Sequence, residues 1–565
     1  MLLDLLIKNV YVYNSYYKEF IVEDVIIKDG RFLYMGKEWD TGLEFQEVID
    51  GQGYYMIPGL IDIHLHIESS MTTPSQFSAA IIRHGTTTVV ADPHEIANVL
   101  GIEGIKAMID SYNGDGVDIF YGIPSSVPST SQALETTGGR IGLAEVLDLL
   151  KLKQVCCLGE VMNCKDLVAV GPTLIKQIIG LVKKQEQHLP IEGHCPKISG
   201  YELANYIYNG VDSDHTQQTP ETIAEKIKNG MFMEIQSKSL TQDNITYLVK
   251  HNLFEHFCFV TDDVMADKLM AGHLNLLIKD AIKLGMAAED AIYAATYTPA
   301  LRMGMKDRGS IAPGKIADFI LLQDKNKFMI DAVYKNGKKV ETSDNGAGCY
   351  FPRHFYRSVK LSPVSQQDFM LNVPMETGRV RCRVMYVTPD TTFTQAGEGA
   401  LNIINNELQW EDSAYCLICV FERYTGSGRK GVGLVGGSII KEGAIATTYA
   451  HDHHNLLVMG RNKRDMEVAA NWVIANQGGY CVVKNGQVIA ALELPIGGIL
   501  SAENVQVIGS KLKKIRVAMQ AMGYQHQKEI MSFSTLSLPV SPSLKITDQG
   551  LIDVRKQEIV QLIID

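Results

Sequence analysis

Two histidines separated by a single residue, His64 and His66, follow the apolar segment 56–63 (MIPGLIDI). Residues two apart in a β-strand point to the same side, so two such imidazoles can bind one metal ion. Imidazole binds several transition metals, and the pair therefore does not identify the metal. The alternative is a pair of histidines that hydrogen-bond within a core. The positions of the other ligand-type residues favour the metal-binding interpretation.

Ligand-type residues also follow later strand-like segments, in a regular order along the chain. In sequence order they are Asp92, His94 and Glu95 after segment 86–91, Glu160 after 156–159, His194 after 190–193, Asp214 and His215 after 210–213, and Asp262 and Asp263 after 257–261. Enzymes built on a barrel of parallel strands carry their chemistry at the carboxyl ends of those strands. This order therefore predicts that the histidines and carboxylates converge on one site.

The segments between residues 57 and 307 alternate in character. Short apolar strands such as 86–91 precede helix-like stretches. Repeated βα units predict a parallel sheet, and the number of units favours a closed barrel. Residues 1–56 instead look all-β, and a similar pattern returns late, where Asn336-Gly337 is a strong hairpin signal. We predict that these two β segments, which lie before and after the barrel in the sequence, form one small sheet domain.

The composition describes a globular protein with several domains. A length of 565 residues suggests about three domains, because single domains usually have ~100–200 residues. The net charge of -11, with acidic and basic residues interspersed, argues against a nucleic-acid-binding surface. No apolar run approaches the ~20 residues that span a bilayer, and ten scattered cysteines are typical of free thiols in a reducing cytosol. We therefore predict a cytoplasmic protein with no nucleic-acid and no membrane partner.

The chain resembles a known family at the segments that carry these residues. PGLIDIHLH, GTTTVVADPHE, GEVMN, GHCP, SDHTQ and FVTDD are similar to the successive metal-site motifs of the amidohydrolase superfamily. Within it, HIESSMTTPSQF, ADPHEIANVLG, AHDHHN and LPIGGILS resemble the bacterial adenine deaminase family, and the resemblance covers essentially the whole chain. It implies an α/β fold with a distorted TIM-like (β/α)8 barrel at 57–307, a composite β-sandwich domain from 1–56 plus 308–345, and an additional α+β C-terminal domain at 360–565.

The resemblance also implies a site for two divalent metal ions, Mn2+ or Fe2+, with Zn2+ as an alternative. The implied ligands are His64, His66, Glu160, His194, His215 and Asp262. In this arrangement His64, His66 and Asp262 hold the more buried ion. His194 and His215 hold the second ion, and Glu160 bridges both, where many relatives use a carboxylated lysine.

The implied activity is hydrolytic deamination of adenine to hypoxanthine and ammonia, with a metal-activated hydroxide attacking C6. Asp262 is expected to take the water proton and pass it to the departing amino group. A second acid must protonate ring N1, and Glu95 is the candidate, with His94 as the alternative. The residues expected to bind substrate are Ser126, Glu135 and Thr136. The expected partner is a small-molecule purine, and the superfamily resemblance implies a homo-oligomer.

Two departures from the family pattern leave the substrate open. In the stretch after SDH, where the family commonly has an arginine, this chain has Gln236 within 233–238. Where the family commonly reads TDDRH, this chain has Val264 and Met265 after its two aspartates. Loss of those basic side chains would remove charge and donors near the site, so another aminopurine or a cyclic amide is the alternative substrate. A non-catalytic relative is less favoured, because all the metal ligands are present.

The C-terminal motif AHDHHN contains His451, His453 and His454. Clustered imidazoles bind metals, but a single short run lacks the second half of a defined site. Metal binding and a structural or substrate-lid role therefore both stay open for this loop. Cys416 and Cys419 form a lone CxxC flanked by apolar residues, which predicts a buried strand rather than a zinc site.

Overall fold

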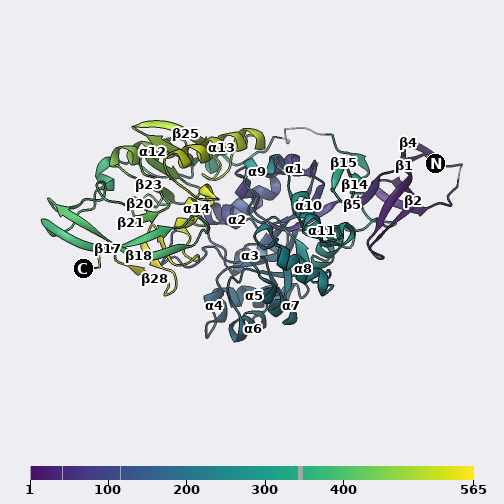
Figure 1. Cartoon of the computed structure of the whole chain (residues 1–565), viewed down its shortest axis with the longest axis horizontal. Coiled ribbons are helices and arrows are strands. Elements are labelled where there is room, and N and C mark those ends of the chain that lie inside the picture. The colour runs from purple at the N-terminus through teal and green to yellow at the C-terminus, as the bar shows by residue number, and fades with distance from the viewer. Residues whose placement is uncertain (1, 41, 115, 342–347, 565) are drawn as a thin grey trace.

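The computed structural model describes residues 2–40, 42–114, 116–341 and 348–564. The molecule is elongated (Figure 1). An N-terminal sheet lies at one end, a unit of alternating strands and helices lies in the middle, and a C-terminal region of strands and helices lies at the other end. The middle unit carries most of the predicted site residues.

The N-terminal strands and a later group of strands form a single sheet. Its members are β1 (Leu2–Asn14), β2 (Glu19–Lys28), β3 (Arg31–Gly36), β4 (Glu44–Asp50), β5 (Tyr55–Pro58), β14 (Phe319–Asp324), β15 (Met329–Lys335) and β16 (Lys338–Lys339). β5 and β14 pair antiparallel, so the sheet joins segments from both sides of the middle unit. Asn336 and Gly337, with φ of 51° and 75°, form the two-residue turn between β15 and β16, as the hairpin signal predicts. Residues 342–345 of the expected composite domain lie outside the described residues, and the domain boundaries stay predictions.

The middle unit contains a five-stranded and a three-stranded parallel sheet. The first has the order β10-β9-β8-β7-β6 and the second β11-β12-β13. Their bounds are β6 (Leu60–Leu65), β7 (Thr86–Ala91), β8 (Asp118–Ile123), β9 (Val155–Val161), β10 (Ile191–Gly193), β11 (Ser213–Asp214), β12 (Phe232–Ile235) and β13 (Phe257–Phe259). β6 and β7 are buried at every position, as expected for parallel strands covered on both faces.

Backbone hydrogen bonds join these two sheets at both of their edges. The N–H of Asp262, after β13, donates to the carbonyl of His64 in β6 at 3.1 Å. At the other junction, the N–H of Asp212 donates to the carbonyl of Ile191 in β10 at 3.2 Å. The parallel strands therefore form one curled arrangement whose carboxyl ends lie on the same side.

Helices connect the strands of the middle unit and cover them. They are α1 (Pro74–Ile82), α2 (His94–Asp110), α3 (Leu143–Leu149), α4 (Cys164–Val168), α5 (Leu174–Gln185), α6 (Gly200–Tyr208), α7 (Pro220–Lys228), α8 (Gln242–Lys250), α9 (Ala266–Leu269), α10 (Leu274–Lys283) and α11 (Ala288–Arg302). α5 illustrates the pattern: it buries Ile175, Ile178, Ile179 and Val182, an i, i+3, i+4, i+7 stripe that faces the core.

The C-terminal region is built on a nine-stranded sheet with the order β19-β18-β17-β21-β20-β23-β22-β24-β25. Its strands are β17 (Thr377–Val387), β18 (Thr394–Ile404), β19 (Glu407–Leu408), β20 (Cys416–Phe421), β21 (Lys430–Gly437), β22 (Ala444–Thr447), β23 (Leu456–Gly460), β24 (Gly479–Lys484) and β25 (Gln487–Glu493). The remaining elements are α12 (Lys463–Ala475), α13 (Val505–Ala521), α14 (Glu529–Ser534) and a small sheet of β26 (Leu544–Thr547), β27 (Gly550–Asp553) and β28 (Glu558–Val560). Cys416 and Cys419 are free, buried thiols in β20, which confirms the buried-strand interpretation.

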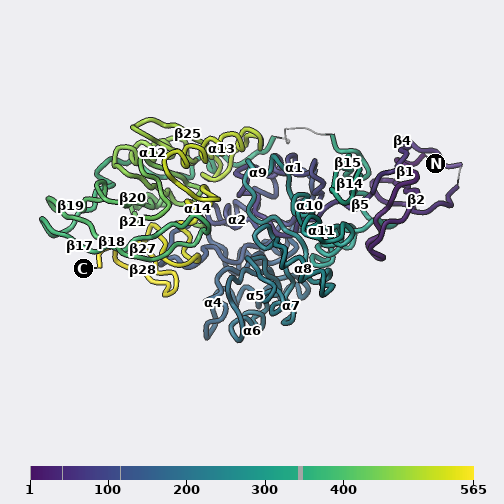
Figure 2. The backbone as a smooth tube through the Cα atoms, in the orientation of Figure 1, coloured from purple at the N-terminus to yellow at the C-terminus, as the bar shows by residue number. Residues whose placement is uncertain are grey.

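The middle unit and the C-terminal region share one apolar core. Ile96 of α2 belongs to the same cluster of buried side chains as Tyr449 and Ile496. α13 packs against α9, where Arg516 donates to the carboxylate of Asp267 at 2.9 Å. In Figure 2 the green-to-yellow tube of the C-terminal region lies against the part of the chain that carries α2. This contact brings the AHDHHN loop to the middle unit.

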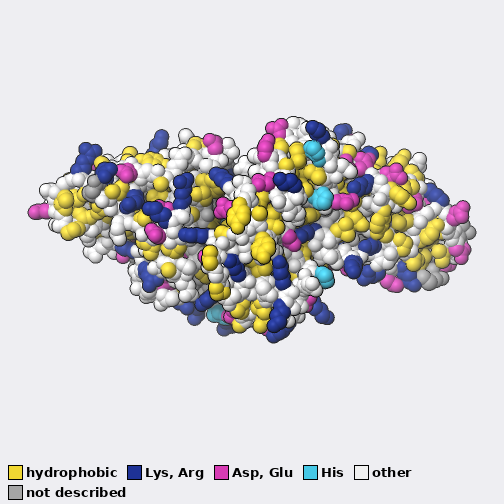
Figure 3. Space-filling view, turned by 90° about the horizontal axis from the view of Figure 1, so that it is seen from below, with side chains coloured by type: hydrophobic (Ala, Val, Ile, Leu, Met, Phe, Trp, Pro, Cys, Tyr) yellow, Lys and Arg dark blue, Asp and Glu magenta, His cyan; other side chains and the backbone are white. Residues whose placement is uncertain are grey.

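Basic and acidic side chains are interspersed over the face shown in Figure 3. That distribution agrees with the mixed charge pattern of the sequence. Within the described part of the chain, no helix combines the length and apolar character needed to cross a membrane.

Candidate metal centre

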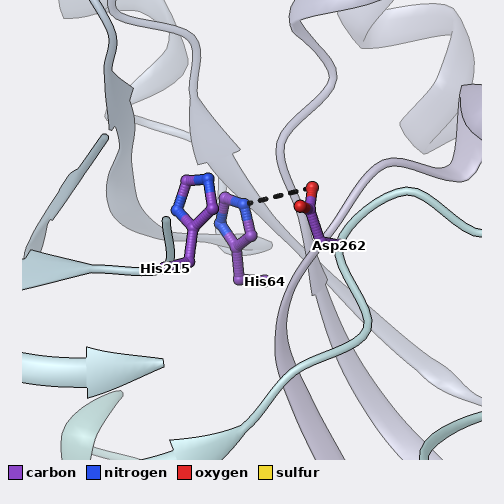
Figure 4. Close-up of side chains that lie close together, drawn as sticks. All are labelled: His64, His215 and Asp262. Atoms are coloured by element: carbon purple, nitrogen blue, oxygen red, sulfur yellow. Dashed lines mark ion pairs between the residues drawn. The ribbon is translucent and has the colours of Figure 1, made fainter. Parts of the chain in front are cut away.

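His64, His66 and Asp262 lie together at the carboxyl ends of two adjacent strands. His64 is in β6 and His66 follows it, while Asp262 comes shortly after β13. Asp262 has a φ of 58°, a left-handed conformation that is uncommon outside glycine but that aspartate tolerates. The ring of His215 stacks on that of His64 with ring centres 3.8 Å apart. Figure 4 shows His64, His215 and Asp262.

The ligand atoms of this group face one another at distances suited to a shared ion. Nε2 of His64 is 4.0 Å from Oδ1 of Asp262 (Figure 4), and Nε2 of His66 is 3.5 Å from the same oxygen. Two ligands at ~2.0–2.2 Å from one ion lie roughly 3–4 Å apart. Nε2 of His64 is buried, and no described residue forms a hydrogen bond with it. An unpartnered buried nitrogen that faces a carboxylate fits a metal ligand.

Glu160, in β9, lies between two sets of histidines. Its Oε1 is 3.5 Å from Nε2 of His66, whereas its Oε2 is 2.8 Å from Nδ1 of His194 and 3.3 Å from Nε2 of His215. The two oxygens of one carboxylate thus face different imidazoles, as a bridging ligand requires. Burial raises the pKa of Glu160, but the charge of His215 and the hydrogen bond from His194 outweigh burial and hold that pKa well below its usual range. The ionised form is the one that binds metal.

All six expected ligands lie in one cluster. Overlapping groups of three among them have ligand atoms within 4.8 Å of one another. Burial and the nearby charge of His215 lower the pKa of His64 to about 3, so its imidazole is neutral, as a ligand must be. Histidine nitrogens combined with carboxylate oxygens suit divalent transition metals. The residues present therefore fit a divalent metal site.

Asp92, directly after β7, orients two of these ligands. Its carbonyl oxygen lies 3.0 Å from Nδ1 of His66, and a proton donated there leaves Nε2 free for a metal. Its Oδ2 accepts the N–H of Glu160 at 2.8 Å. A Cβ at Gly159 would lie 2.2 Å from that same oxygen. Glycine before Glu160 therefore allows Asp92 to hold the bridging carboxylate in place.

Asp62 ties together the strand ends that carry His64 and Asp262. Its carboxylate accepts the N–H of His64 at 3.3 Å and the N–H and hydroxyl of Thr261 at 3.1 and 2.7 Å. His273 contacts the same Thr261 hydroxyl at 3.2 Å. Burial raises the pKa of Asp62 to about 7. This buried network keeps the ends of β6 and β13 in register.

Asp214 performs a similar task behind His215. Its Oδ2 accepts hydrogen bonds from Nζ of Lys226 at 2.6 Å and from the hydroxyl of Thr216 at 2.8 Å. Its Oδ1 accepts a hydrogen bond from the N–H of Cys195 at 2.9 Å. Cys195 follows His194 in the chain. The buried Asp214–Lys226 pair thus fixes the backbone beside both histidines of the second expected metal position.

Gln236 and Lys238, after β12, contact the carboxylate of Asp262. Nε2 of Gln236 donates to Oδ2 of Asp262 at 2.7 Å and to the carbonyl of His215 at 2.8 Å, and Nζ of Lys238 is 3.8 Å from the same Oδ2. Burial raises the pKa of Asp262, but the hydrogen bond with His66 and the charge of Lys238 hold that pKa well below its usual range. In the stretch that lacks the common arginine, Gln236 therefore supplies hydrogen-bond donors and Lys238 supplies positive charge beside Asp262.

Glu95 lies in the first turn of α2 and is only 1% exposed. Its Oε1 contacts Nδ1 of His451, and its Oε2 contacts Nε2 of His454. Burial raises the pKa of Glu95, but the charges of His451 and His454 outweigh burial and hold the pKa well below its usual range. A lowered pKa favours the ionised carboxylate, and the role of Glu95 in protonating ring N1 stays a prediction. His94 lies between Glu95 and the metal cluster. Its Nε2 is 3.7 Å from Oε1 of Glu95, and its Nδ1 is 3.7 Å from Oε1 of Glu160.

The AHDHHN loop thus directs two of its three histidines at Glu95. His453 differs, because its Nδ1 accepts the N–H of Asn455 at 3.0 Å. The contacts of His451 and His454 favour the structural or lid interpretation of the loop over a separate metal site.

Ser126 and Glu135 are both buried. The hydroxyl of Ser126 is 3.2 Å from that of Ser125, which donates to the carbonyl of Glu160 at 2.6 Å. Oε1 of Glu135 accepts the hydroxyl of Ser129 at 2.8 Å, whereas its Oε2 has no hydrogen-bond partner among the described residues. Ser126 therefore lies close to the metal cluster, and Glu135 keeps one free buried acceptor.

Thr136 contacts the C-terminal region instead. Its N–H and its hydroxyl donate to Oδ1 and Oδ2 of Asp548 at 2.9 and 2.6 Å. Both polar groups of Thr136 are thereby occupied by a contact between domains, and its role in substrate binding stays a prediction.

Sequence reasoning assigned no role to Asp62, Lys226 or Lys238, although each contacts the site. The signal for Asp62 was present, since a charged residue within the apolar run 56–63 must have partners when it is buried. Lys226 and Lys238 gave no comparable signal, because lysines in helix-like and loop-like segments are usually solvated.

Comparisons with known proteins identify the family of the chain. Residues 55–340 match the family model described as Amidohydrolase family, and residues 391–558 match the Adenine deaminase C-terminal domain. The chain is 57% identical over 570 residues to "Adenine deaminase" of Clostridium perfringens (strain ATCC 13124), with 100% of both chains covered. It is 51% identical over 575 residues to "Adenine deaminase 2" of Shouchella clausii (strain KSM-K16), again with 100% of both covered.

A curled parallel sheet with histidines and carboxylates at its strand ends, together with the match over 55–340, makes the chain a member of the amidohydrolase family. Within that class it belongs to the adenine deaminase family, because the full-length relatives and the C-terminal match agree.

Proposed function

We propose that this protein hydrolyses adenine to hypoxanthine and ammonia. The observation that carries the proposal is the convergence of six expected ligands, which leaves Nε2 of His64 buried and unpartnered among the described residues. Relatives named adenine deaminase match over the whole chain. This supports a hydrolase that acts on a C–N bond of a small purine.

The proposal includes a distorted (β/α)8 barrel as the framework of the site. The hydrogen bonds from Asp262 to His64 and from Asp212 to Ile191 join the two parallel sheets at both edges, which supports closure. It also includes two divalent ions, Mn2+ or Fe2+. Hard carboxylate oxygens from Glu160 and Asp262 suit these metals, and Zn2+ is the alternative.

When bound, the ions would lower the pKa of the attacking water, so that it is a nucleophile near neutral pH. Asp262 accepts a proton from this water as its oxygen bonds to C6 of adenine. The C6–N6 bond then breaks, and Asp262 returns the proton to the departing nitrogen, which leaves as ammonia. Lys238 and Gln236 hold Oδ2 of Asp262, so Oδ1 remains directed at His64 and His66.

The second proton of the water ends on ring N1 of hypoxanthine. Glu95 and His94 are the proposed proton-handling pair for N1. Burial lowers the pKa of His94, but hydrogen bonding with Asp92 outweighs burial and raises that pKa. The N1 proton is therefore held on the imidazole of His94 and passes through the Glu95 carboxylate, whose Oε1 is 3.7 Å from Nε2 of His94. The C6 hydroxyl group of the product then gives its proton back to this imidazole. Water thereby supplies both protons that the products gain.

The test is ammonia release by protein loaded with Mn2+ or Fe2+, measured against adenine, other aminopurines and cyclic amides. We expect stoichiometric ammonia and hypoxanthine from adenine, with metal bound at the site. Turnover of another aminopurine or a cyclic amide, without turnover of adenine, would contradict the proposed substrate and retain the hydrolase class.

A further inference from the structure

We propose that His451 and His454 of the C-terminal region are positioning residues that hold the carboxylate of Glu95 in its working orientation. The inference rests on the proposed function, in which Glu95 handles the proton of ring N1. It assigns the C-terminal region a direct part in the reaction, because this region supplies both histidines.

The two histidines bind opposite oxygens of the same carboxylate. Nδ1 of His451 contacts Oε1 and Nε2 of His454 contacts Oε2, and the rings are inclined at 48° to each other. Two directional contacts on the two oxygens fix both the position and the plane of a carboxylate. All three residues are at most 5% exposed, so water does not compete for these contacts.

The loop that carries the histidines is itself held by side chains of its own domain. Ser537 donates to the carbonyl of His451 at 3.2 Å, and Tyr424 donates to the carbonyl of His453 at 2.6 Å. The guanidinium of Arg423, which is fully buried, donates to the carbonyl of His454 and to that of Gly497. A loop held at the carbonyl groups of His451, His453 and His454 presents its imidazoles with little freedom.

Gly497 also connects the loop to the helix that carries Glu95. A Cβ at this glycine would lie 3.1 Å from Ile96, the residue after Glu95. The LPIGGILS segment therefore packs against the first turn of α2, while the AHDHHN loop contacts Glu95 itself. Both contacts fix the same turn of the helix.

The alternative is that the Glu95 contacts only stabilise the junction between domains. The path to the metal cluster argues for more than that. Oε1 of Glu95, which His451 contacts, is also 3.7 Å from Nε2 of His94, and the other ring nitrogen of His94 is 3.7 Å from the bridging Glu160. A misplacement of about 1 Å near reacting groups can lower a rate by ~10²-fold. A change in the contacts of His451 or His454 with Glu95 should therefore lower the rate of deamination.

Amide side chains separate the two explanations. Asn places an N–H near the position of histidine Nδ1, and Gln places one near Nε2. His451→Asn and His454→Gln therefore keep a matched donor, whereas His451→Gln and His454→Asn move the donor by about one bond. All four substitutions keep a polar side chain of similar size. His453→Asn is the control, because it keeps an acceptor for the N–H of Asn455 and does not touch Glu95.

We expect the mismatched variants to lower kcat by ~10- to 100-fold, with KM and metal content near the wild-type values. The matched variants should recover most of this loss, and His453→Asn should behave as wild type. In a Glu95→Gln background, His451→Gln should cause little further loss, because residues that act through one group are not additive. Wild-type kcat in the mismatched variants, or a full additional loss in the Glu95→Gln background, would overturn the inference.

The thermal midpoints of the same variants provide a readout that needs no substrate. Glu95→Gln and His451→Gln should be strongly non-additive in their effects on the midpoint, because they break the same contact. If adenine gives no ammonia with the wild type, the proposed substrate fails, and the kinetic comparison is made on the substrate that the panel identifies. Additive midpoints would show that the contact itself is absent.

Discussion

The two sides of the site are built in different ways. The metal side uses side chains from the ends of adjacent parallel strands, so the contacts follow from the order of the strands. Glu95 instead receives its partners from the C-terminal region, and His454 lies 359 residues from it in the sequence. The first side depends on one sheet, and the second depends on how two domains pack.

This difference suggests separate requirements for binding metal and for moving protons. Asp62, Asp92 and Asp214 each tie a ligand to a neighbouring strand end. The Glu95 carboxylate instead takes its contacts from His451 and His454 of the C-terminal region. We therefore expect substitutions on the metal side to change metal content, and substitutions on the Glu95 side to change rate at constant metal content.

The largest effect is expected for Glu160→Gln. This change removes the charge that faces both groups of imidazoles while it preserves shape. Without metal a water keeps a pKa near 15.7 instead of about 7, so we expect ammonia release to fall by at least ~10⁴-fold and metal content to fall with it. Glu186→Gln, at the exposed glutamate directly after α5, is the matched control and should keep its metal. Retention of both metal ions by Glu160→Gln would contradict the bridging assignment.

Lys226→Met tests the local support behind His215. The change leaves the buried Asp214 carboxylate without its cation, and loss of one partner from a buried pair costs about 3–5 kcal/mol of unfolding free energy. Chemical denaturation measures this cost. Lys228→Met, on the exposed side of the same helix, should change stability by less than ~0.5 kcal/mol. Equal effects of the two substitutions would show that the pair does not support the strand ends.

The pair of Asp214 and Lys226 should also make the unfolding free energy depend on pH in acid. Burial raises the pKa of Asp214, but the charges of Lys226 and His215 outweigh burial and lower the pKa from 3.8 to about 2. A carboxyl whose folded pKa is lowered stabilises the fold above its unfolded pKa, and this stability is lost as pH falls through the folded pKa. We expect a loss of ~2 kcal/mol between pH 3.8 and 2, measured as unfolding free energy against pH. Lys226→Met should show a smaller loss in this window.

The metal side of the site was largely predictable from the sequence. Each parallel strand ends at the same side of the sheet, so a histidine or carboxylate after each apolar segment is enough to predict convergence. All six expected ligands do lie together. β8 was not recognised, because Pro124 and serines follow it instead of ligand-type residues. Its position is set by pairing with β7 and β9, which is tertiary information.

The contacts of Glu95 could not be predicted in this way. No periodicity links an early helix to a loop hundreds of residues later, and AHDHHN alone is compatible with metal binding. The charge near Asp262 also could not be predicted from the sequence. The sequence lacks the common arginine in this stretch, but Lys238 reaches Asp262 from two positions beyond Gln236. Spatial replacement of one cation by another depends on loop geometry that one sequence does not reveal.

Gln236→Leu tests whether the hydrogen bond from Gln236 to Asp262 is needed for activity. Leucine fills similar space but donates no hydrogen bond to Asp262 or to the carbonyl of His215. Loss of a partner that orients a ligand typically costs ~10- to 100-fold, and Lys238 remains near the same oxygen, so we expect about a tenfold fall in kcat. Gln236→Glu should be worse, because it places a second negative charge beside Asp262. The measurement is kcat at saturating adenine with metal content determined in parallel.

The smallest effect is expected for Thr136→Val, which tests whether the contact between domains also binds substrate. The substitution removes the hydroxyl that donates to Asp548 but keeps the N–H bond. The same hydroxyl also accepts hydrogen bonds from Gln549 at 3.0 Å and from Arg429 at 3.3 Å. Each lost hydrogen bond costs about 1 kcal/mol, so we expect the unfolding free energy to fall by about 1–2 kcal/mol, with KM for adenine unchanged. Ser126→Ala is the contrasting variant, because Ser126 lies near Glu160 and should alter kcat or KM with little change in stability. A raised KM in Thr136→Val at unchanged stability would instead assign Thr136 to the substrate.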